Sequence, residues 1–376
     1  MRHLRSNIKS LVTKLKQNKE YLRHINSCIG FDGYVDEIIR VVKSRDSLSD
    51  YEVFSTIEEF ADSIRVASNN SSDIEIIVQE VKMGGNAPIM ANAMANLGVS
   101  VKCIGTFGAK KIHDVFKVRN SRLKVISIGE AAYSHAFEFS DGKLMFGKAE
   151  TLNNISWEKI ISKVGIQQFI DYFSDSQLIG MANWSSIIHM NDILNSIYKE
   201  VTPVIDAMSL NNKYCFFDIA DPSKRKSEDL IEFMSILKSF SKRLKVILGL
   251  NEKEARILFS LLNNDVNAEE NDINYIAKYI YNSIGIDTLV VHTKTMAIAV
   301  AEGELLESNG FFVSKPIILT GSGDNFNAGF CIGKVLKLTL EECLMLGNAT
   351  SSYYVKQGRS PKFNELIGYL NKYSEV

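Results

Sequence analysis

The sequence has few of the features that mark secreted, membrane-spanning or nucleic-acid-binding proteins. Its five cysteines are widely separated and form no C-x-x-C pair, which predicts reduced, buried thiols and, with them, a cytoplasmic protein. No apolar run reaches the roughly 18 residues of a membrane span. Lysine and arginine number 43 against 44 acidic residues, without a long basic stripe. We therefore expect a partner that is neither a membrane nor a nucleic acid.

The N-terminal segment, residues 1–24, is basic and lacks the apolar core of a secretory signal. Its apolar side chains recur at helical spacing: Leu4, Ile8, Leu11, Val12 and Leu15. This pattern favours a surface helix that docks its apolar stripe on the rest of the protein. An organelle-targeting helix is the alternative.

The 376 residues, 45% hydrophobic and 23% charged, suffice for one large α/β domain or two smaller ones. Short apolar runs alternate with helical patterns, which predicts a βαβ architecture whose sheet is covered on both faces. The predicted strands lie at 27–31, 99–104, 178–180, 215–217, 246–248 and 288–291. The predicted helices lie at 87–97, 252–262, 273–284, 324–336 and 340–356.

Two segments interrupt this alternation. Residues 134–139 and 144–146 flank an Asp-Gly turn and alternate apolar side chains, which predicts an antiparallel hairpin. Such a hairpin could be a flap that excludes water from a cleft, or an edge hairpin or dimer contact. Residues 43–73 are polar and rich in Ser and Asn, and we expect an insertion with one short helix at 57–64.

The most informative stretch is 319–330. Gly321 and Gly323 frame Ser322, Asp324 follows at once, and a helix of small residues then continues. Glycines bring backbone N–H groups close to a ligand, and a helix start adds free donors and a positive dipole end. A carboxylate there could take a proton from an attacking hydroxyl. The stretch indicates phosphoryl transfer, and a glycine turn before an acidic helix start is the structural alternative.

Other glycine motifs do not fit this region. A Rossmann fingerprint needs glycine at position 326, which is Phe, and a serine-hydrolase elbow needs glycine at position 320, which is Thr. A Walker A loop needs four residues between its glycines and Ser or Thr after its lysine. Only three residues separate Gly329 from Gly333-Lys334, and Val335 follows.

Polar residues near two predicted helix starts could bind hydroxyl groups. Gly84-Gly85 permits close approach of a ligand, and Asn86 offers a donor and an acceptor, or caps the helix that follows. Asp32 and Asp36 follow the first strand, where ligands of α/β sheets bind. Turn-forming aspartates are the alternative there.

Further candidates follow later strands. Asn251 and Glu254 stand at i,i+3 spacing near a helix start, where they could hold Mg²⁺-bound waters and phosphates or form a capping box. His292 ends another strand, and we expect it to make a hydrogen bond or a base-edge contact. The six histidines have no metal-ligand spacing, so we expect no metal bound directly by side chains.

Taken in order, these elements resemble the PfkB/ribokinase family of carbohydrate and nucleoside kinases over about residues 26–361. The strongest segments are 84–105 and 320–330, and Asn251-Glu252-Lys253-Glu254 is similar to the family's Asn-x-x-Glu motif. The resemblance implies a doubly wound, mainly parallel α/β kinase domain over 25–376. It also implies a discontinuous β lid at 34–42 and 131–148, beside the N-terminal extension at 1–24 and the insertion at 43–73.

By the same resemblance, the chain is an ATP- and Mg²⁺-dependent kinase that phosphorylates a hydroxyl of a sugar or sugar-like polyol. Asp324 would be the general base, and Gly321, Ser322 and Gly323 the anion hole. The acceptor's hydroxyls would be bound by Asp36, Gly84, Gly85 and Asn86, and Asp32 is the second candidate for the role of Asp36. The nucleotide and its Mg²⁺-phosphate group would be bound by Asn251, Glu254, His292, Thr293 and Asn348.

The chain departs from the family at two places. Ile318-Leu319 stands where the family has the Asp-Thr that helps hold a monovalent cation, so the resemblance supports no potassium activation. His292-Thr293-Lys294 replaces a Thr-x-Gly turn under the nucleotide, which leaves nucleotide preference open. The alternatives are a nucleoside kinase of the same fold and a catalytically silent sensor. In the nucleoside kinase, Tyr34 and Trp184 could stack on a base, although both could equally be core residues. A homodimer through the lid is also left open.

Overall fold

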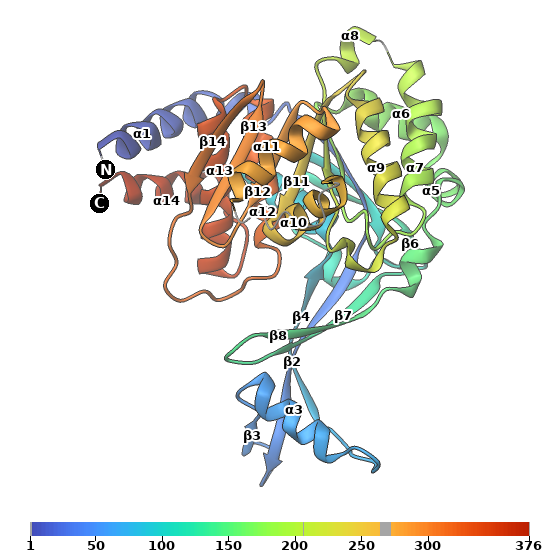
Figure 1. The fold of residues 1–376 in the computed structure, drawn as a ribbon, viewed down its shortest axis with the longest axis vertical. Helices are drawn as coiled ribbons and strands as arrows, with labels where there is room; N and C mark the ends of the chain where they lie inside the picture. The colour runs from blue at the N-terminus through green and yellow to red at the C-terminus, as the bar shows by residue number, and fades with distance from the viewer. Residues whose placement is uncertain (1, 206, 264–271, 376) are drawn as a thin grey trace.

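A computed structural model describes residues 2–205, 207–263 and 272–375, and its larger part is built on a nine-stranded sheet (Figure 1). The strand order is β14-β13-β12-β11-β10-β9-β1-β5-β6. The bounds are β1 (Asn26–Phe31), β5 (Ser100–Thr106), β6 (Leu123–Gly129), β9 (Leu178–Met181), β10 (Tyr214–Asp218), β11 (Lys245–Asn251), β12 (Thr288–His292), β13 (Met296–Ala301) and β14 (Glu304–Asn309). The pairs β12–β13 and β13–β14 are antiparallel, and the other pairs are parallel. The predicted mainly parallel α/β sheet is confirmed, although β6, β13 and β14 were not predicted.

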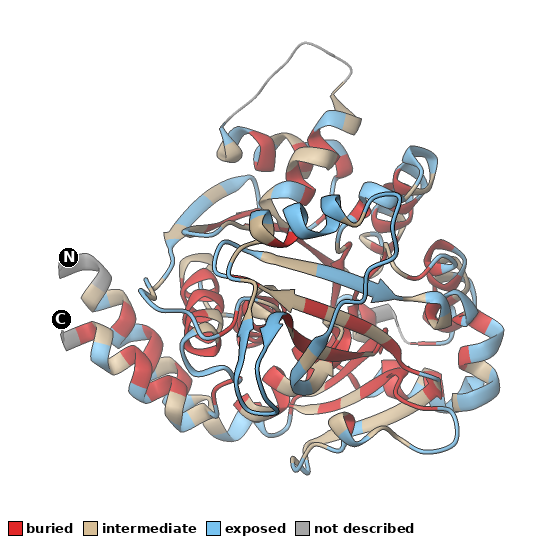
Figure 2. Ribbon diagram, turned by 90° about the horizontal axis from the view of Figure 1, so that it is seen from below, coloured by how far each residue is buried: buried red, intermediate tan, exposed pale blue. Residues whose placement is uncertain are grey.

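Helices cover both faces of this sheet, and burial is concentrated between the layers (Figure 2). One face packs against α5 (Trp157–Val164), α6 (Ile166–Asp175), α7 (Met190–Ser196), α9 (Ser227–Phe240), α10 (Glu252–Leu262) and α11 (Ile273–Ile284). The other packs against α1 (Arg2–Gln17), α4 (Asn86–Leu97), α12 (Ser322–Val335), α13 (Leu340–Gln357) and α14 (Phe363–Glu375). In β10, Cys215 and Phe217 face the first group and Phe216 the second. Strands buried on both faces explain the continuous apolar runs.

The remaining helical segments are short. They are α2 (Lys19–Leu22), α8 (Ala207–Leu210), η1 (Asp114–Phe116), η2 (Glu150–Asn154), η3 (Ile197–Val201), η4 (Thr202–Val204) and η5 (Pro222–Lys224). Among the longer helices, α10 and α11 have the predicted bounds, and α4 ends as predicted at Gly98, whose φ is 114°. Helical periodicity and local capping therefore located these helices correctly.

The strand order reverses at β1, which places the ligand-binding crevice. From β1 the chain passes to β5 and β6 on one side and later fills β9 to β12 on the other. In open α/β sheets, ligands bind beyond the carboxyl ends of strands at such a switch point. Several polar residues are delivered to this edge: Asp32 after β1, Asp218 at the end of β10, Asn251 at the end of β11 and His292 at the end of β12.

A second, smaller sheet projects from the large domain as an arm (Figure 1). Its strands are β2 (Tyr34–Arg45), β3 (Tyr51–Val53), β4 (Ile76–Gly84), β7 (Ala132–Glu138) and β8 (Lys143–Lys148). The long strand β2 pairs with β4, β7 and, at its far end, β3. The predicted hairpin is confirmed as β7 and β8. The strand β4 was not predicted, and most of its side chains are exposed.

The polar segment 43–73 builds the tip of this arm. The strand β2 continues into it, and the helix predicted at 57–64 is α3 (Ile57–Val66). Phe60 of α3 stacks on Phe139 with ring centroids 5.6 Å apart, and Val41 completes a small apolar cluster. The tip therefore has its own small core.

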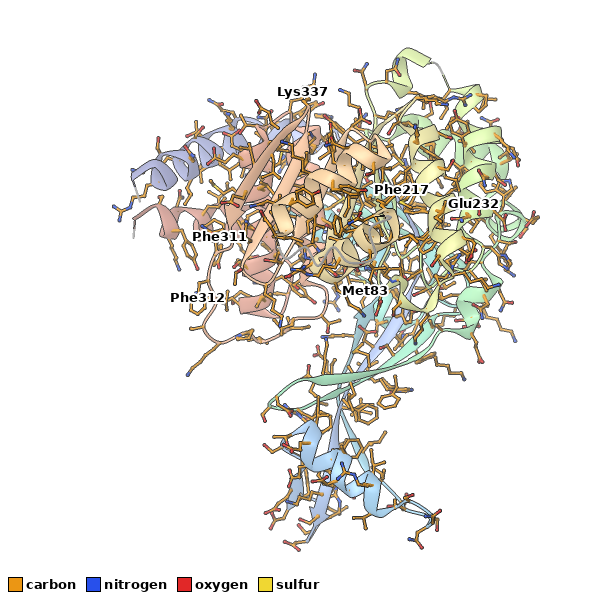
Figure 3. All side chains as sticks on the ribbon, in the orientation of Figure 1. Met83, Phe217, Glu232, Phe311, Phe312 and Lys337 are labelled. Carbon is orange, nitrogen blue, oxygen red and sulfur yellow. The ribbon has the colours of Figure 1, made fainter. Side chains whose placement is uncertain are left out.

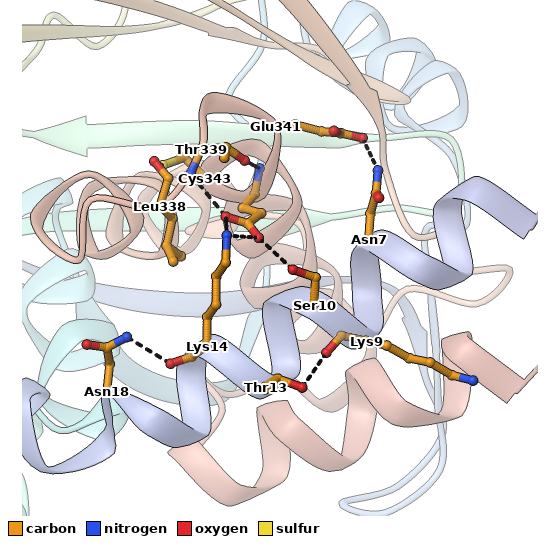
Figure 4. A network of polar contacts seen from close by, with 11 residues as sticks. Asn7, Lys9, Ser10, Thr13, Lys14, Asn18, Leu338, Thr339, Glu341 and Cys343 are labelled. Carbon is orange, nitrogen blue, oxygen red and sulfur yellow. Dashed lines mark hydrogen bonds and ion pairs between the residues drawn. The ribbon is translucent and has the colours of Figure 1, made fainter.

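The N-terminal helix docks on the large domain. The helix α1 lies beside α14 (Figure 1), and Ile8, Leu11, Val12 and Leu15 are buried. Lys14 forms an ion pair with Glu342 at 2.7 Å, and Asn7 Nδ2 donates to Glu341 Oε1 at 2.6 Å (Figure 4). The predicted docking is confirmed for these residues, while Met1 and the Leu4 side chain lie outside the described part.

The five cysteines are all free and buried, as predicted. Among the helices of the described ranges, none is both long and apolar enough to cross a membrane.

The buried stripe of α1 makes the helix testable as part of the fold. Leu11 is 0% exposed, so Leu11→Ala should lower the free energy of unfolding by about 2–5 kcal/mol through lost burial and a residual cavity. Lys16→Ala, on the exposed side of α1, is the control and should change it by less than about 0.5 kcal/mol. Urea unfolding measures both. Equal, small effects would mean that α1 adds nothing to the stability of the domain.

Candidate active site

Asp324 lies in the first turn of α12, as predicted. Gly321 is the N-cap with a φ of 89°, a left-handed conformation that glycine adopts at little cost. The Ser322 N–H donates to Leu319 O at 3.1 Å, which closes the turn before the helix. The N–H groups of Gly323 and Asp324 lie in the first turn, where helical bonding provides no partner. Backbone donors and the positive end of α12 therefore lie beside a carboxyl group.

The surroundings of Asp324 make its carboxylate a strong base. The side chain is 8% exposed, and burial raises its pKa well above the ordinary value, with the charges of Asp218 and Asp32 adding to the effect. A hydrogen bond from the Asn86 side chain opposes this rise. A raised pKa suits a group that takes a proton from a hydroxyl.

The predicted acceptor residues meet where the arm joins the large domain. Asp36 of β2 is 4% exposed, and burial raises its pKa to about 6, although Lys82 and Lys143 of the neighbouring strands act against the rise. Its carboxylate lies against Gly84: a Cβ at Gly84 would be 2.1 Å from Asp36 Oδ1. Space therefore requires glycine at position 84.

The Asp32 side chain caps the N-terminus of α4. Asp32 Oδ2 accepts from Asn86 N at 2.9 Å, and Asp32 Oδ1 accepts from Ala87 N at 2.8 Å. Asn183 Nδ2 donates to Asp32 Oδ2 at 2.7 Å. Gly85, with a φ of 97°, is the N-cap and Asn86 the first helical residue, so the interpretation of Asn86 as the cap is wrong. The Asn86 side chain is instead free to turn toward Asp218, 3.3 Å away.

The predicted nucleotide residues meet at a large cavity. Ser322 and Gly323 line a cavity of about 1170 Å³ together with Asn251, His292, Thr293 and Asn348. Asp324 and Glu254 are not among its lining residues. Asp36 and Asn86 are not among its lining residues either, and its volume is large enough for a drug-sized ligand.

The Asn251 and Glu254 pair forms the capping box that was the alternative to a phosphate site. Glu254 Oε2 accepts from Asn251 N at 2.8 Å, and Asn251 Oδ1 accepts from Glu254 N at 2.9 Å. Burial raises the pKa of Glu254 well above its ordinary value, and the charge of Asp218 adds to this. The box is confirmed, and it holds Asn251 at the cavity wall.

The other predicted cavity residues have distinct surroundings. His292 lies against the start of α12, since a Cβ at Gly323 would be 3.1 Å from its Nε2. Burial lowers the pKa of His292 to about 4, so the imidazole is neutral near pH 7. Thr293 Oγ1 donates to Met296 O at 3.1 Å and closes the turn after β12. Asn348 Nδ2 donates to a backbone carbonyl at the end of β14, 3.1 Å away.

Sequence reasoning missed several residues of the cavity wall. Lys253, Arg256 and Lys294 line it and bring positive charge. Phe311 and Phe312, on the loop after β14, add an apolar wall (Figure 3). Lys253 stands inside the Asn-x-x-Glu motif and Lys294 directly after His292-Thr293, so the motifs themselves could have pointed to these cations.

Asp218 was also missed. It is the last residue of β10, is 7% exposed, and burial raises its pKa to about 6. The signal was an acid directly after an apolar strand, which is the same signal that singled out Asp32.

No group of three or more His, Cys, Asp or Glu side chains in the described ranges is arranged to hold a metal ion.

The suggested base-stacking role of Trp184 is wrong. Trp184 is 1% exposed, its Nε1 donates to Asn191 Oδ1 at 2.7 Å, and the Arg225 guanidinium lies 4.3 Å from its ring centroid. It is a core residue. Tyr34 is half-buried, and burial raises its pKa to about 12.

Comparison with known proteins identifies relatives over nearly the whole chain. Residues 8–373 match the family described as prokaryotic ketohexokinase. The ketohexokinase of Haloferax volcanii is 27% identical over 346 residues, which cover 92% of this chain and 90% of that protein. The adenosine kinase structure from Sinorhizobium meliloti has 17% identity and a TM-score of 0.64, over 93% of this chain and 99% of that one. A putative ribokinase II from E. coli, in complex with ATP and Mg²⁺, has 14% identity and a TM-score of 0.58, over 94% and 99%. These structures establish a ribokinase-like fold.

The buried carboxyl group of Asp36 predicts a specific pH dependence of stability. Its pKa is 3.8 ordinarily and about 6 in the folded protein. Between these values the folded state holds a proton that the unfolded state has released, so the wild type loses stability as pH rises through this window. Relative to wild type, Asp36→Asn should therefore gain stability from about pH 4 to about pH 7, by at most about 3 kcal/mol.

Urea unfolding over this pH range measures the difference. Glu52→Gln, on the exposed strand β3, is the control for the loss of a surface carboxyl group and should change the free energy of unfolding by less than about 0.5 kcal/mol. If the difference in the free energy of unfolding between Asp36→Asn and the wild type did not change with pH, the desolvation of Asp36 would be contradicted.

Proposed function

The chain belongs to the prokaryotic ketohexokinase family, and we propose on this basis that it transfers a phosphoryl group from ATP to a hydroxyl of a ketohexose. It is a carbohydrate kinase, and the ketohexose acceptor follows the name of its relative from Haloferax volcanii. The observation that carries the proposal is the position of Asp324. The buried carboxyl group lies at the start of α12, between the cluster around Asn86 and the turn that lines the large cavity.

Asp324 is the proposed general base. The acceptor's hydroxyl gives its proton to the Asp324 carboxylate while its oxygen bonds to the terminal phosphorus of ATP. The bond from that phosphorus to the bridging oxygen breaks, and ADP leaves. The raised pKa of Asp324 increases its proton affinity, and burial keeps water from competing as acceptor.

Gly321, Ser322 and Gly323 are the proposed anion hole. The positive end of α12 and the first-turn N–H groups face the place where negative charge would gather. One such donor contributes roughly 3 kcal/mol to the stability of a transition state in comparable sites. Catalysis of this kind depends on positioning and electrostatics rather than on a covalent intermediate.

Asp36 and Asn86, with Gly84 and Gly85, are the proposed contacts to the acceptor's hydroxyls. Asp36 comes from the arm and Asn86 from α4, so acceptor binding would bring the two parts of the protein together. Asp32 supports this group from below through its bonds to the start of α4. The arm would then act as the lid over the acceptor.

The large cavity fits a nucleoside triphosphate. Lys253, Arg256 and Lys294 supply cations for phosphates, and Phe311 and Phe312 an apolar wall for a base. Asn251 and Glu254 would hold Mg²⁺ through water, and the ion would neutralise charge on the phosphates. His292, Thr293 and Asn348 complete the proposed nucleotide site.

The oligomeric state and the cellular compartment are also proposals. Homodimer formation through the lid is supported by exposed apolar side chains on β4 and β8: Val78, Val81, Met145 and Phe146 are 44%, 46%, 45% and 55% exposed. Five free, buried thiols support a reducing compartment, hence the cytoplasm.

A substrate panel tests the function. D-fructose, D-glucose, D-ribose and adenosine are each supplied with ATP and Mg²⁺, and ADP formation is measured. We expect the highest kcat/KM with D-fructose. Preference for adenosine would establish the nucleoside-kinase alternative, and binding without ADP formation would establish the sensor.

Replacement of the proposed base tests the mechanism. Asp324→Asn should lower kcat by at least about 100-fold with little loss of fold, because the amide cannot accept the hydroxyl proton. Circular dichroism and Tm verify the fold. Asp192→Asn, whose side chain is 80% exposed on α7, is the control and should keep normal activity. Near-normal kcat in Asp324→Asn would refute its role.

A further inference from the structure

Asp218 has no part in the chemistry proposed above, yet donors from three different segments converge on its side chain. Ala220 N donates to Asp218 Oδ1 at 3.0 Å, from the loop after β10. Asn86 Nδ2, at the start of α4, donates to the same oxygen at 3.3 Å. Asn327 Nδ2, on α12, donates to Asp218 Oδ2 at 3.4 Å.

Backbone strain beside Asp218 supports a specific role for this carboxylate. Ala220 has a φ of 51° and Asn183 a φ of 60°, and both donate backbone N–H groups to Asp218. The left-handed conformation costs a residue such as alanine roughly 1–2 kcal/mol. Strained residues of this kind persist where the surrounding structure requires them, and they cluster at functional sites.

The hydrogen bond to Asp218 determines the orientation of the Asn86 amide. Asn86 Nδ2 donates to Asp218 Oδ1 at 3.3 Å, and only the NH₂ end of an amide can donate. The carbonyl oxygen of Asn86 therefore faces away from Asp218. That oxygen is the end of the amide left to accept a hydrogen bond from an acceptor's hydroxyl.

The same carboxylate also reaches the helix that carries Asp324. Asn327 stands one turn after Asp324 on α12 and is 2% exposed. Asp218 thus links the first residue of α4 to α12 through two amide groups. The other ionisable groups near it are all acids, Asp32, Glu254 and Asp324.

We propose that Asp218 is a positioning residue for the acceptor. It holds the Asn86 amide so that the carbonyl oxygen of Asn86 meets the acceptor's hydroxyl beside Asp324. Asp218 does not touch the substrate and acts through Asn86. This role rests on the proposed function, since it concerns the acceptor side of the kinase site.

A double-mutant cycle tests this role. Asp218→Ala removes the oxygen that accepts from the NH₂ of Asn86. With D-fructose, ATP and Mg²⁺ at about pH 8, we expect it to raise the KM for D-fructose at least about tenfold, with the KM for ATP changed less than about twofold. In the Asn86→Ala background, the same change should have less than about a twofold effect, because the group it acts through is gone.

The control is Asp221→Asn, an exposed acid on the same loop that pairs with Lys253 and should leave the KM for D-fructose unchanged. Additive effects of Asp218→Ala and Asn86→Ala would overturn the proposal. The proposal would also be overturned if the KM for ATP or the Mg²⁺ concentration needed for half-maximal activity rose while the KM for D-fructose stayed unchanged. That result would place Asp218 on the nucleotide side of the site.

A second readout of the cycle needs no turnover. If the wild type phosphorylates no member of the panel, the proposed function fails, and the Tm values of the same four proteins still test the contact. Non-additive Tm shifts support the Asp218–Asn86 interaction, and additive shifts refute it. If Asp218→Ala does not fold, Asp218→Ser, which leaves room for water, takes its place in both readouts.

Discussion

The burial of four carboxyl groups at one edge of the sheet is the constraint on which the site depends. Burial raises the pKa of Asp32, Asp218, Glu254 and Asp324. Charges placed there without partners would be very costly, so each acid needs hydrogen-bond donors. Asp32 and Glu254 receive theirs by capping α4 and α10, and Asp218 by accepting from amides. For Asp324 the donor is the Asn86 side chain, which leaves a carboxyl group of high proton affinity beside the free N–H groups of α12.

The topology explains why these acids meet. The strand order reverses at β1, so the ends of β1, β10 and β11 open onto one crevice. Two glycine-bearing helix starts, those of α4 and α12, face that crevice and bring backbone donors to it. The second sheet then carries Asp36 to the same place, against Gly84. The carboxyl groups and backbone donors of the site come from different elements of the fold, and the buried polar contacts hold these elements in fixed relative positions.

Much of this arrangement could be predicted from the sequence, because its signals are local. Periodicity located α10 and α11, and the turn at 320–324 identified Asp324 at a helix start. The strand β4 begins with the apolar run Ile76-Ile77-Val78 and was still missed, because a run of three residues is too short to distinguish a strand from a loop. Asp218 could have been singled out as an acid directly after an apolar strand. Its contact with Asn86, 132 residues away in the chain, could not have been predicted, because two such distant residues form no local pattern.

The sequence by itself determined the α/β alternation, the buried strands, the helix caps and the glycine-framed acid, since each follows from neighbouring residues. Only the tertiary structure decided which contacts each of the two aspartates after β1 makes. Asp32 turns inward to cap α4, while Asp36 lies on the second sheet against Gly84. Both are acids near the end of one strand, and their surroundings differ because strands paired through space place different partners around each carboxyl group.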